Sequence, residues 1–430
     1  MPLGLYISVP FCRTKCTYCN FVSDVFSRAV FEKYVARVCA EIELSPKTAG
    51  EMCGGFARSV DSIYVGGGTP TLLTVEQLQR IFVTIQQNFE LQPHSEITLE
   101  CAPGTLSDET LACFVRCGIN RVSLGVQSFV DEEARSVARL HNRETVLRDI
   151  ARLRAHGISN INVDLIAGLP HQTRESWERS LDELIAAGVP HASVYMLEVD
   201  EDSRLGRELI AGGQKYHAHS VPDDDLTADL YELACERLNA AGIAQYEISN
   251  FARPGFESKH NLKYWIRQPY LGFGVDAHSM LFIDNPIATA SRDERGREGR
   301  DFQSRRKSPE TTGGTAVSRV LPNAIRFSNP DNLDSYLSPS SVRQTSVSSE
   351  AALQETCFLG LRLTKGIDLN AIAAQFGSDA VELVSATAAE CVQSGLMERE
   401  GSYVRLTAKG RLLSNEVFEK FITEPTLLSS

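Results

Sequence analysis

The chain has 430 residues, of which 43% are hydrophobic and 23% charged, and its net charge is -12. This composition is that of a soluble globular protein, and the length exceeds what one hydrophobic core normally supports. We therefore expect one large and one small domain. The acidic balance argues against a broad nucleic-acid surface, so no nucleic-acid partner is expected.

The sequence contains no apolar run near the roughly 18 residues that span a bilayer. Its first residues lack the basic flank and long apolar core of a signal peptide, which favours a cytoplasmic protein. Eleven cysteines are spread along the chain. In a long cytoplasmic chain such cysteines are expected to be reduced thiols, as thiolate metal ligands require.

The first predicted strand, Leu5 to Val9, runs into Pro10 and is followed by three cysteines at C-x3-C-x2-C spacing: Cys12, Cys16 and Cys19. A cubic iron-sulfur cluster normally takes four cysteine ligands, so a loop with three leaves one iron open to a ligand from outside the protein. A structural zinc site is the alternative, but it needs four protein ligands, and the sequence shows no second C-x2-C pair. The loop therefore favours a [4Fe-4S] cluster.

Strand and helix patterns then alternate along the chain. Further strands are expected at 62–65, 96–100, 121–126, 160–166 and 192–197, and helices at 28–44, 75–88, 108–117, 143–156 and 174–187. Six strand-helix units in succession require parallel strands with right-handed crossovers, in a doubly wound sheet or a barrel. In both architectures the functional site lies at the carboxyl ends of the strands.

Polar and glycine residues gather at those predicted strand ends. The turn Gly66-Gly67-Gly68-Thr69-Pro70 offers a backbone that a ligand can approach closely. Glu100, Gln127 and Asp164 follow or end later strands. Each alone has a plain structural explanation as a cap, a surface residue or a rim ion pair, but their repeated placement favours a shared site. Arg139 is the weakest candidate on these grounds.

Beyond a predicted helix at 223–241 and a strand at 246–249 lies the run His260-Asn261-Leu262-Lys263-Tyr264-Trp265. An imidazole beside two large aromatic rings is the composition expected where a flat apolar macrocycle binds. Composition alone favours the alternative, in which Tyr264 and Trp265 are core residues and His260 is a hydrogen-bonded turn histidine.

The last third of the chain begins with a polar stretch that lacks apolar periodicity. We expect a core with its extension at 1–285, a flexible insertion at 286–320, and a C-terminal domain at 321–430. In the last part, helices are expected at 353–363, 369–376 and 380–394, a hairpin at 397–406 and a terminal helix at 407–421. Helices followed by a hairpin have the order of a winged-helix domain, which need not bind DNA.

Together these segments resemble the radical S-adenosylmethionine (SAM) proteins related to oxygen-independent coproporphyrinogen III oxidase. The resemblance rests on the cysteine loop, the glycine turn, the segments at 100–104, 125–129 and 164–170, and the run at 260–265. It implies an incomplete (β/α)6 barrel with a small C-terminal helical, winged-helix-like domain. It also implies that the three cysteines hold a [4Fe-4S] cluster and that SAM is surrounded by Tyr6, Tyr18, Gly67, Gly68, Thr69, Glu100, Gln127, Arg139 and Asp164.

Within this family the chain is similar to the heme chaperone branch. Phe21 stands where the oxidase has an additional cysteine, the oxidase's N-terminal extension is not seen, and the run at His260 matches the branch's H-N-x-x-Y-W motif. The resemblance implies heme binding, with His260 as a candidate ligand, and delivery of heme to membrane haemoproteins. The alternative is an oxidase that decarboxylates propionate side chains of coproporphyrinogen III by radical chemistry. Whether the protein is an enzyme is left open.

Overall fold

The computed structural model describes residues 1–55, 57–283, 324–338 and 342–422, so the insertion predicted at 286–320 lies outside the described residues. Six parallel strands form the centre of one large sheet, paired in the order of the sequence. They are β1 (Leu3–Val9), β2 (Ser59–Gly67), β3 (Glu90–Cys101), β4 (Arg121–Gln127), β5 (Asn160–Ala167) and β6 (His191–Met196). The predicted six strand-helix units are therefore confirmed.

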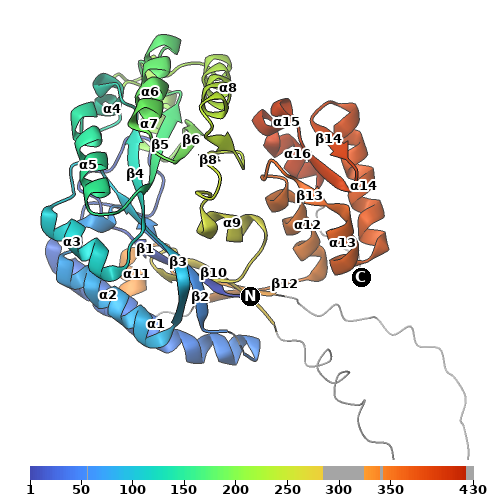
Figure 1. Cartoon of the computed structure of the whole chain (residues 1–430), viewed down its shortest axis with the longest axis horizontal. Coiled ribbons are helices and arrows are strands. Elements are labelled where there is room, and N and C mark those ends of the chain that lie inside the picture. Colours follow the sequence, from blue (N-terminus) through green and yellow to red (C-terminus); the bar gives the residue numbers. More distant parts are fainter. Residues whose placement is uncertain (56, 284–323, 339–341, 423–430) are drawn as a thin grey trace, which may run out of the picture.

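Helices connect the strands and cover the outer face of the curved sheet (Figure 1). They are α1 (Arg28–Cys53), η1 (Pro70–Leu72), α2 (Val75–Asn88), α3 (Asp108–Cys117), α4 (Asp131–Ser136), α5 (Arg143–Ala155) and α6 (Arg174–Ala187). Their starts follow local capping rules. Thr74 and Gln77 form a capping box at α2, and Ser107 caps α3, which ends at Gly118 in the left-handed conformation that glycine adopts freely.

Side chains of β1 alternate between the two faces of the sheet. Leu5 and Ile7 are fully buried in the main hydrophobic core with the helices. Tyr6 lies on the opposite face and approaches Tyr64 of β2, with 6.2 Å between ring centroids. Because the strands are parallel, their carboxyl ends meet at one edge, where the polar motifs lie.

Further strands extend the sheet at both edges, and its order is β12-β11-β10-β9-β1-β2-β3-β4-β5-β6-β8-β7. Only β9 joins β1 in parallel among these additions; the other pairings are antiparallel. The added strands and helices are α7 (Arg204–Ala211), η2 (Ala218–Ser220), α8 (Asp224–Ala240), β7 (Ala244–Gln245), β8 (Asn250–Ala252), α9 (Lys259–Trp265), β9 (Tyr270–Gly274), β10 (His278–Phe282), β11 (Ala324–Ser328), α11 (Leu333–Leu337) and β12 (Arg343–Val347).

The predicted strand at 246–249 is wrong, because these residues connect β7 to β8. Their backbone pairs with a distant segment instead: the Ile248 N–H donates to the Arg362 carbonyl at 3.1 Å, and the Thr364 N–H donates to the Tyr246 carbonyl at 3.0 Å. Ile248 itself packs in the C-terminal core. The connection thus joins the barrel to the C-terminal part of the chain.

The C-terminal part forms a separate helical lobe beside the barrel, drawn in orange and red in Figure 1. It comprises α12 (Ser349–Gly360), β13 (Ile367–Asp368), α13 (Leu369–Phe376), α14 (Ser378–Gln393), β14 (Met397–Glu400), β15 (Tyr403–Leu406), α15 (Ala408–Leu412) and α16 (Ser414–Lys420). The expected three helices and hairpin are present. The single helix expected at 407–421 is instead two helices that break at Leu413.

The predicted boundary at residue 321 precedes two strands, β11 and β12, that hydrogen-bond to the large sheet. The division of the chain into three parts stays a prediction. In the part of the chain that the structure describes, no helix combines the length and apolar character needed to cross a bilayer.

Candidate functional site

The cysteine loop leaves the carboxyl end of β1 and is held there from both sides. The ring of Phe11 stacks on Phe31 of α1, with 3.8 Å between centroids. The Cys12 N–H donates to the Asp24 carbonyl at 2.9 Å, and the Asp24 N–H donates back to Pro10 at 3.0 Å. These contacts close the loop, so its three cysteines lie at the strand end predicted for them.

All three cysteines of the loop are free thiols and partly exposed. Burial raises the pKa of Cys12 and Cys19, so deprotonation needs a compensating positive charge. Within the described residues no three His, Cys, Asp or Glu side chains converge on a position for one metal ion. A cubane binds each cysteine through a different iron and does not require that convergence. The three thiolates of one loop fit a cluster that leaves one iron open, whereas a structural zinc site is closed by four protein ligands.

A pocket of about 340 Å³ opens beside Cys16 and Cys19. Charged side chains of both signs line it, among them Lys15, Asp200 and Arg204. The α7 segment supplies the outer wall, and the Leu205 N–H donates to the Thr17 carbonyl at 2.9 Å. The cysteine loop is thus reachable from solvent through a polar opening.

The glycine turn runs directly beside the cysteine loop. The Gly68 N–H donates to the Val9 carbonyl at 2.7 Å, and the Thr69 N–H donates to the Phe11 carbonyl at 2.6 Å. A Cβ added at Gly68 would lie 2.6 Å from the Phe11 oxygen, and Gly67 has a φ of +101°. Gly68 is therefore required because the two segments approach too closely for a side chain, and Gly67 because its positive φ disfavours any other residue.

Glu100 at the end of β3 reaches across to this turn. Its Oε2 accepts a hydrogen bond from the Gly67 N–H at 3.1 Å, and its Oε1 accepts one from the Tyr64 hydroxyl at 2.8 Å. A Cβ at Gly66 would lie 2.8 Å from the same carboxylate. Burial raises the pKa of Glu100 to about 7, although the bond from Tyr64 offsets part of that effect.

Arg139 connects the cysteine loop to the end of β4. Its Nη1 donates to the Cys16 sulfur at 3.4 Å, and its Nη2 donates to the Gly125 carbonyl. Gln127, with a φ of +70°, ends β4 beside an irregular register with β5, and its amide lies near Gly125. Arg139, the candidate that the sequence supported least, is thus the one that hydrogen-bonds to a cysteine of the loop.

The remaining candidates lie around the same strand ends. Asp164 accepts hydrogen bonds from Ser123 at 3.1 Å and from Asn162 at 2.7 Å, and burial raises its pKa. Burial likewise raises the pKa of Tyr18, which packs against a small apolar cluster that contains Val137. Tyr6 lies deeper, on the inner face of the sheet.

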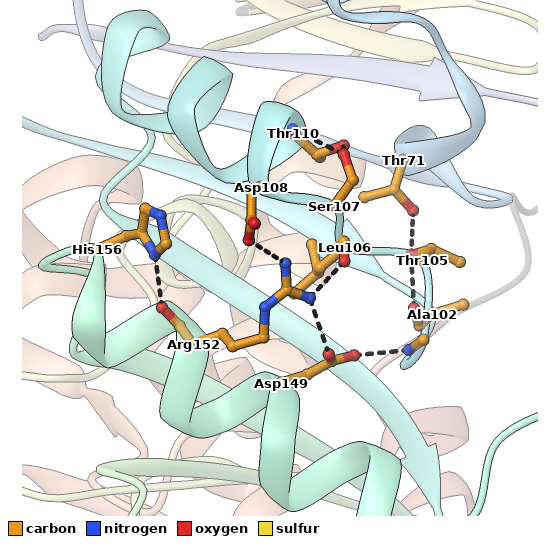
Figure 2. A network of polar contacts seen from close by, with 11 residues as sticks. Thr71, Ala102, Thr105, Leu106, Ser107, Asp108, Thr110, Asp149, Arg152 and His156 are labelled. Atoms are coloured by element: carbon orange, nitrogen blue, oxygen red, sulfur yellow. Dashed lines mark hydrogen bonds and ion pairs between the residues drawn. The ribbon is translucent and has the colours of Figure 1, made fainter.

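A polar network fixes the loop that follows Glu100 (Figure 2). The buried carboxylate of Asp149 on α5 accepts from the Gly104 N–H at 2.6 Å, and Arg152 donates to the Leu106 carbonyl at 2.5 Å. The hydroxyls of Thr71 and Thr105 lie 2.7 Å apart and join this loop to η1. The network therefore ties the glycine turn, the Glu100 loop and α5 together.

His260 is not brought to this edge of the sheet. It lies near the amino ends of β1 and β2, where its Nδ1 is 3.1 Å from the Ser62 hydroxyl and its Nε2 is 2.7 Å from the Tyr264 hydroxyl. The side chain is buried, and burial lowers its pKa to about 3. The hydrogen-bonded histidine weighed as the alternative is what the geometry shows, so metal ligation by His260 requires one of these two bonds to break.

Sequence reasoning missed charged residues inside the barrel. Arg121 of β4 is almost fully buried, and Glu96 of β3 accepts from the N–H groups of Lys259 and His260 at the start of α9. The buried Lys263 forms an ion pair at 2.7 Å with Asp61, which is partly exposed. Arg121 could have been found from the alternation of side chains along a strand. It shares one face of β4 with Ser123, Gly125 and Gln127, and this is the inner face.

Two family models match the chain: the Radical SAM superfamily over residues 6–184 and the HemN C-terminal domain over residues 347–413. A curated protein from Bacillus subtilis, "Heme chaperone HemW", is 31% identical over 97% of this chain and 99% of its own length. The Escherichia coli protein of the same name is 34% identical over 71% of this chain and 78% of its own length.

Among solved structures, coproporphyrinogen III oxidase (HemN) from Escherichia coli has a TM-score of 0.75 and 22% sequence identity, covering 98% of this chain and 90% of its own. The family models and this fold define the class: the chain is a radical SAM protein. That superfamily implies a [4Fe-4S] cluster and SAM as cofactors. Within the class, the chain belongs to the HemW family, since its similarity to the curated HemW proteins extends over nearly the whole length.

Proposed function

We propose that this protein is a cytoplasmic heme chaperone that binds a [4Fe-4S] cluster, SAM and heme and delivers heme to membrane haemoproteins. The proposal is supported by similarity to the HemW proteins over 97% of the chain, which includes both the barrel and the C-terminal lobe. The comparisons favour this function over the oxidase alternative, because curated relatives that match 97% or 98% of the chain carry the chaperone name.

In this proposal Cys12, Cys16 and Cys19 hold the cluster, and its fourth iron is left for SAM. Arg139 offsets the negative charge of the thiolates through its contact with Cys16. When bound, the cluster supplies an electron that can be passed to SAM.

SAM would lie along the glycine turn. Its charged groups need exposed backbone polar groups and charged partners, and its ribose needs a carboxylate or amide acceptor. Glu100, Gln127 and Asp164 offer such acceptors from three neighbouring strands. Tyr6, Tyr18, Gly67, Gly68 and Thr69 complete the proposed surroundings. Calorimetry should show weaker SAM binding in Gln127→Ala, with exposed Gln87→Ala of α2 as the control; equal affinities in the two variants would remove Gln127 from the site.

For heme, His260 stays the proposed ligand of the H-N-x-x-Y-W motif, and the structure provides a specific test. Removing the Tyr264 hydroxyl by Tyr264→Phe frees Nε2 of His260 without removing the ring. If His260 binds the heme iron, Tyr264→Phe should retain or strengthen the heme Soret band, whereas His260→Ala should shift or weaken it. A band that is unchanged in His260→Ala would exclude this ligand, and His278 would then be tested because its side chain is 63% exposed.

The experiment that tests the function itself combines two assays on anaerobically purified wild-type protein. A carrier should give a saturable heme Soret band and no protoporphyrinogen when it is supplied with coproporphyrinogen III, SAM and a reductant. Turnover of coproporphyrinogen III would establish the oxidase instead. Absence of saturable heme binding would contradict the chaperone proposal.

A further inference from the structure

A second pocket lies at the other end of the barrel from the cysteine loop, between α9 and the C-terminal lobe. It has a volume of about 300 Å³ and is lined mainly by apolar groups. Trp265 and Phe282 contribute from the barrel, and Leu363, Ile367 and Ile372 contribute from the lobe. We call it the interlobe pocket. Its volume is at the lower limit for small-molecule sites, so it suits one edge of a larger ligand.

The wall of this pocket contains buried hydrogen-bond donors without protein partners. Arg267 lines the pocket with its side chain 4% exposed; its Nε donates to Glu355 at 2.9 Å, but Nη1 and Nη2 have no partner among the described residues. The indole N–H of Trp265, a neighbouring lining residue, is also buried and unpaired. An unpaired donor away from water is costly, so three such donors beside one pocket indicate an acceptor.

Two further arginines lie close to Arg267 and Trp265. The guanidinium groups of Arg267 and Arg326 share the single carboxylate of Glu355, at 2.9 and 3.1 Å. Arg362 lies over the Trp265 ring at 4.3 Å and faces buried Glu247 at 3.7 Å. These three guanidinium groups thus face the carboxylates of Glu355 and Glu247, behind the residues that line the pocket.

The carboxylate of Asp368 does line the interlobe pocket, and with it the three arginines are matched by three carboxylates. It already accepts from the Asn370 N–H at 3.0 Å, at the start of α13. Burial lowers the pKa of Arg267, which means that its charged form lacks solvation that a bound anion would restore.

We propose that the interlobe pocket receives one edge of the heme, with a propionate carboxylate accepting hydrogen bonds from Arg267 and from the Trp265 indole N–H. In this proposal the Arg267 side chain rotates to bring Nη1 and Nη2, which are buried and unpaired, to the ligand. The apolar edge of the macrocycle packs against Phe282, Leu363 and Ile372. This inference rests on the proposed function, because heme supplies the combination of flat apolar surface and carboxylate.

A pocket that holds only one edge leaves the rest of the macrocycle outside the wall. Such partial enclosure suits a carrier, which has to release heme to an acceptor. It also assigns a role to the C-terminal lobe. The lobe supplies most of the residues that line the pocket, and Thr364 and Arg362 hold it to the barrel through the connection between β7 and β8.

The test is an absorbance titration of the full-length, cluster-loaded protein with hemin and, separately, with hemin dimethyl ester, whose propionates are blocked. Arg267→Met removes the charge while keeping much of the side-chain length. Ala371→Trp fills the pocket from an exposed position on α13, and Ala374→Trp, exposed on the same helix and outside the pocket, is its matched control. Thermal melting checks that each variant is folded.

We expect Arg267→Met to weaken hemin binding roughly tenfold or more, as loss of a charge-assisted hydrogen bond does, and to leave the binding of the ester nearly unchanged. Ala371→Trp should weaken both ligands, and Ala374→Trp neither. Because the chain has two tryptophans, a second readout is available: hemin should quench wild-type fluorescence more than that of Trp265→Phe.

The possible failures are distinguishable. If the wild type binds hemin and the affinities of Arg267→Met and Ala371→Trp are unchanged, the interlobe pocket is excluded and the proposed function stands. If Ala371→Trp does not fold, the affinities of Arg267→Met for hemin and for the dimethyl ester become the deciding measurement. An equal loss of affinity for both ligands would contradict the hydrogen bond between Arg267 and a propionate. If the wild type shows no saturable hemin binding, the proposed function fails, and this inference fails with it.

Discussion

Arg139 and Cys16 are joined by a hydrogen bond of 3.4 Å from Nη1 to the cysteine sulfur, although 123 residues separate them in sequence. The same guanidinium donates to the Gly125 carbonyl at the end of β4. A partly buried cation therefore links the cysteine loop to the strand ends proposed to hold SAM. Through these contacts Arg139 can offset the charge of a thiolate and also hold the cysteine loop to β4.

The first prediction follows from this contact. Arg139→Gln removes the positive charge beside Cys16, so a bound cluster should lose iron to a chelator severalfold faster than in the wild type. Arg135→Gln is the matched control, since Arg135 is exposed on the neighbouring helix α4. Iron release is followed by the absorbance of a ferrous chelate. Equal release rates in the two variants would show that Arg139 does not stabilise the cluster.

The second prediction concerns the pH dependence of Glu100. Its pKa is raised from 4.5 to about 7 in the folded, cofactor-free protein, so the folded state holds this proton more tightly than the unfolded state. Its stabilising contribution is complete below about pH 4.5 and is lost as the pH rises through 7. Between pH 5.5 and 8.5 the wild type should lose about 2 kcal/mol more unfolding free energy than Glu100→Gln, measured by urea denaturation. If the unfolding free energies of the wild type and Glu100→Gln changed equally with pH, the raised pKa of Glu100 would be contradicted.

The third prediction separates two glycines. Gly68→Ala places a Cβ 2.6 Å from the Phe11 carbonyl oxygen, so it should displace the cysteine loop, lower the melting temperature and reduce iron content together. Gly50→Ala in α1 meets no atom within 4 Å and should be neutral or stabilising by about 0.5–1 kcal/mol. Melting curves and iron analysis of both variants provide the check. Normal iron content in Gly68→Ala would mean that the loop tolerates the shift.

The fourth prediction tests the network in Figure 2. Asp149→Ala leaves the Gly104 N–H without its acceptor and should cost about 1–3 kcal/mol of unfolding free energy. Asp108→Ala breaks an ion pair with the same Arg152 and should cost less than Asp149→Ala, because Asp108 is exposed and water screens the pair. Denaturant unfolding of the two variants compares them directly. A larger loss of unfolding free energy in Asp108→Ala than in Asp149→Ala would contradict the prediction that the buried hydrogen bond contributes more than the exposed ion pair.

Local patterns explain what could be read from the sequence. The ends of α2, α3 and α6 were predicted to the residue, because apolar periodicity and capping side chains are determined by neighbouring residues. The convergence of Glu100 with the glycine turn was also predictable, since parallel strands bring their carboxyl ends together. The strand at 246–249 was predicted wrongly because its backbone partners, near residue 362, lie more than 100 residues later.

The individual contacts of the site depended on tertiary structure. Nothing in the glycine turn alone indicates that Gly68 is needed for close approach to Phe11. The contact of His260 with Ser62 is likewise not predictable from the sequence, because Ser62 lies on a strand 198 residues earlier. The unpaired donors of Arg267 and Trp265 become visible only when the C-terminal lobe is folded against the barrel.

The most direct test of the cluster assignment is the iron and sulfide content of anaerobically reconstituted protein. The wild type should contain about four irons and four sulfides per chain, and Cys12→Ala, Cys16→Ala and Cys19→Ala should each lose the cluster absorbance. Cys235→Ala, which changes a partly buried cysteine outside the loop, should retain the wild-type content. Full iron and sulfide content in all three loop variants, or zinc in place of iron in the wild type, would contradict the assignment.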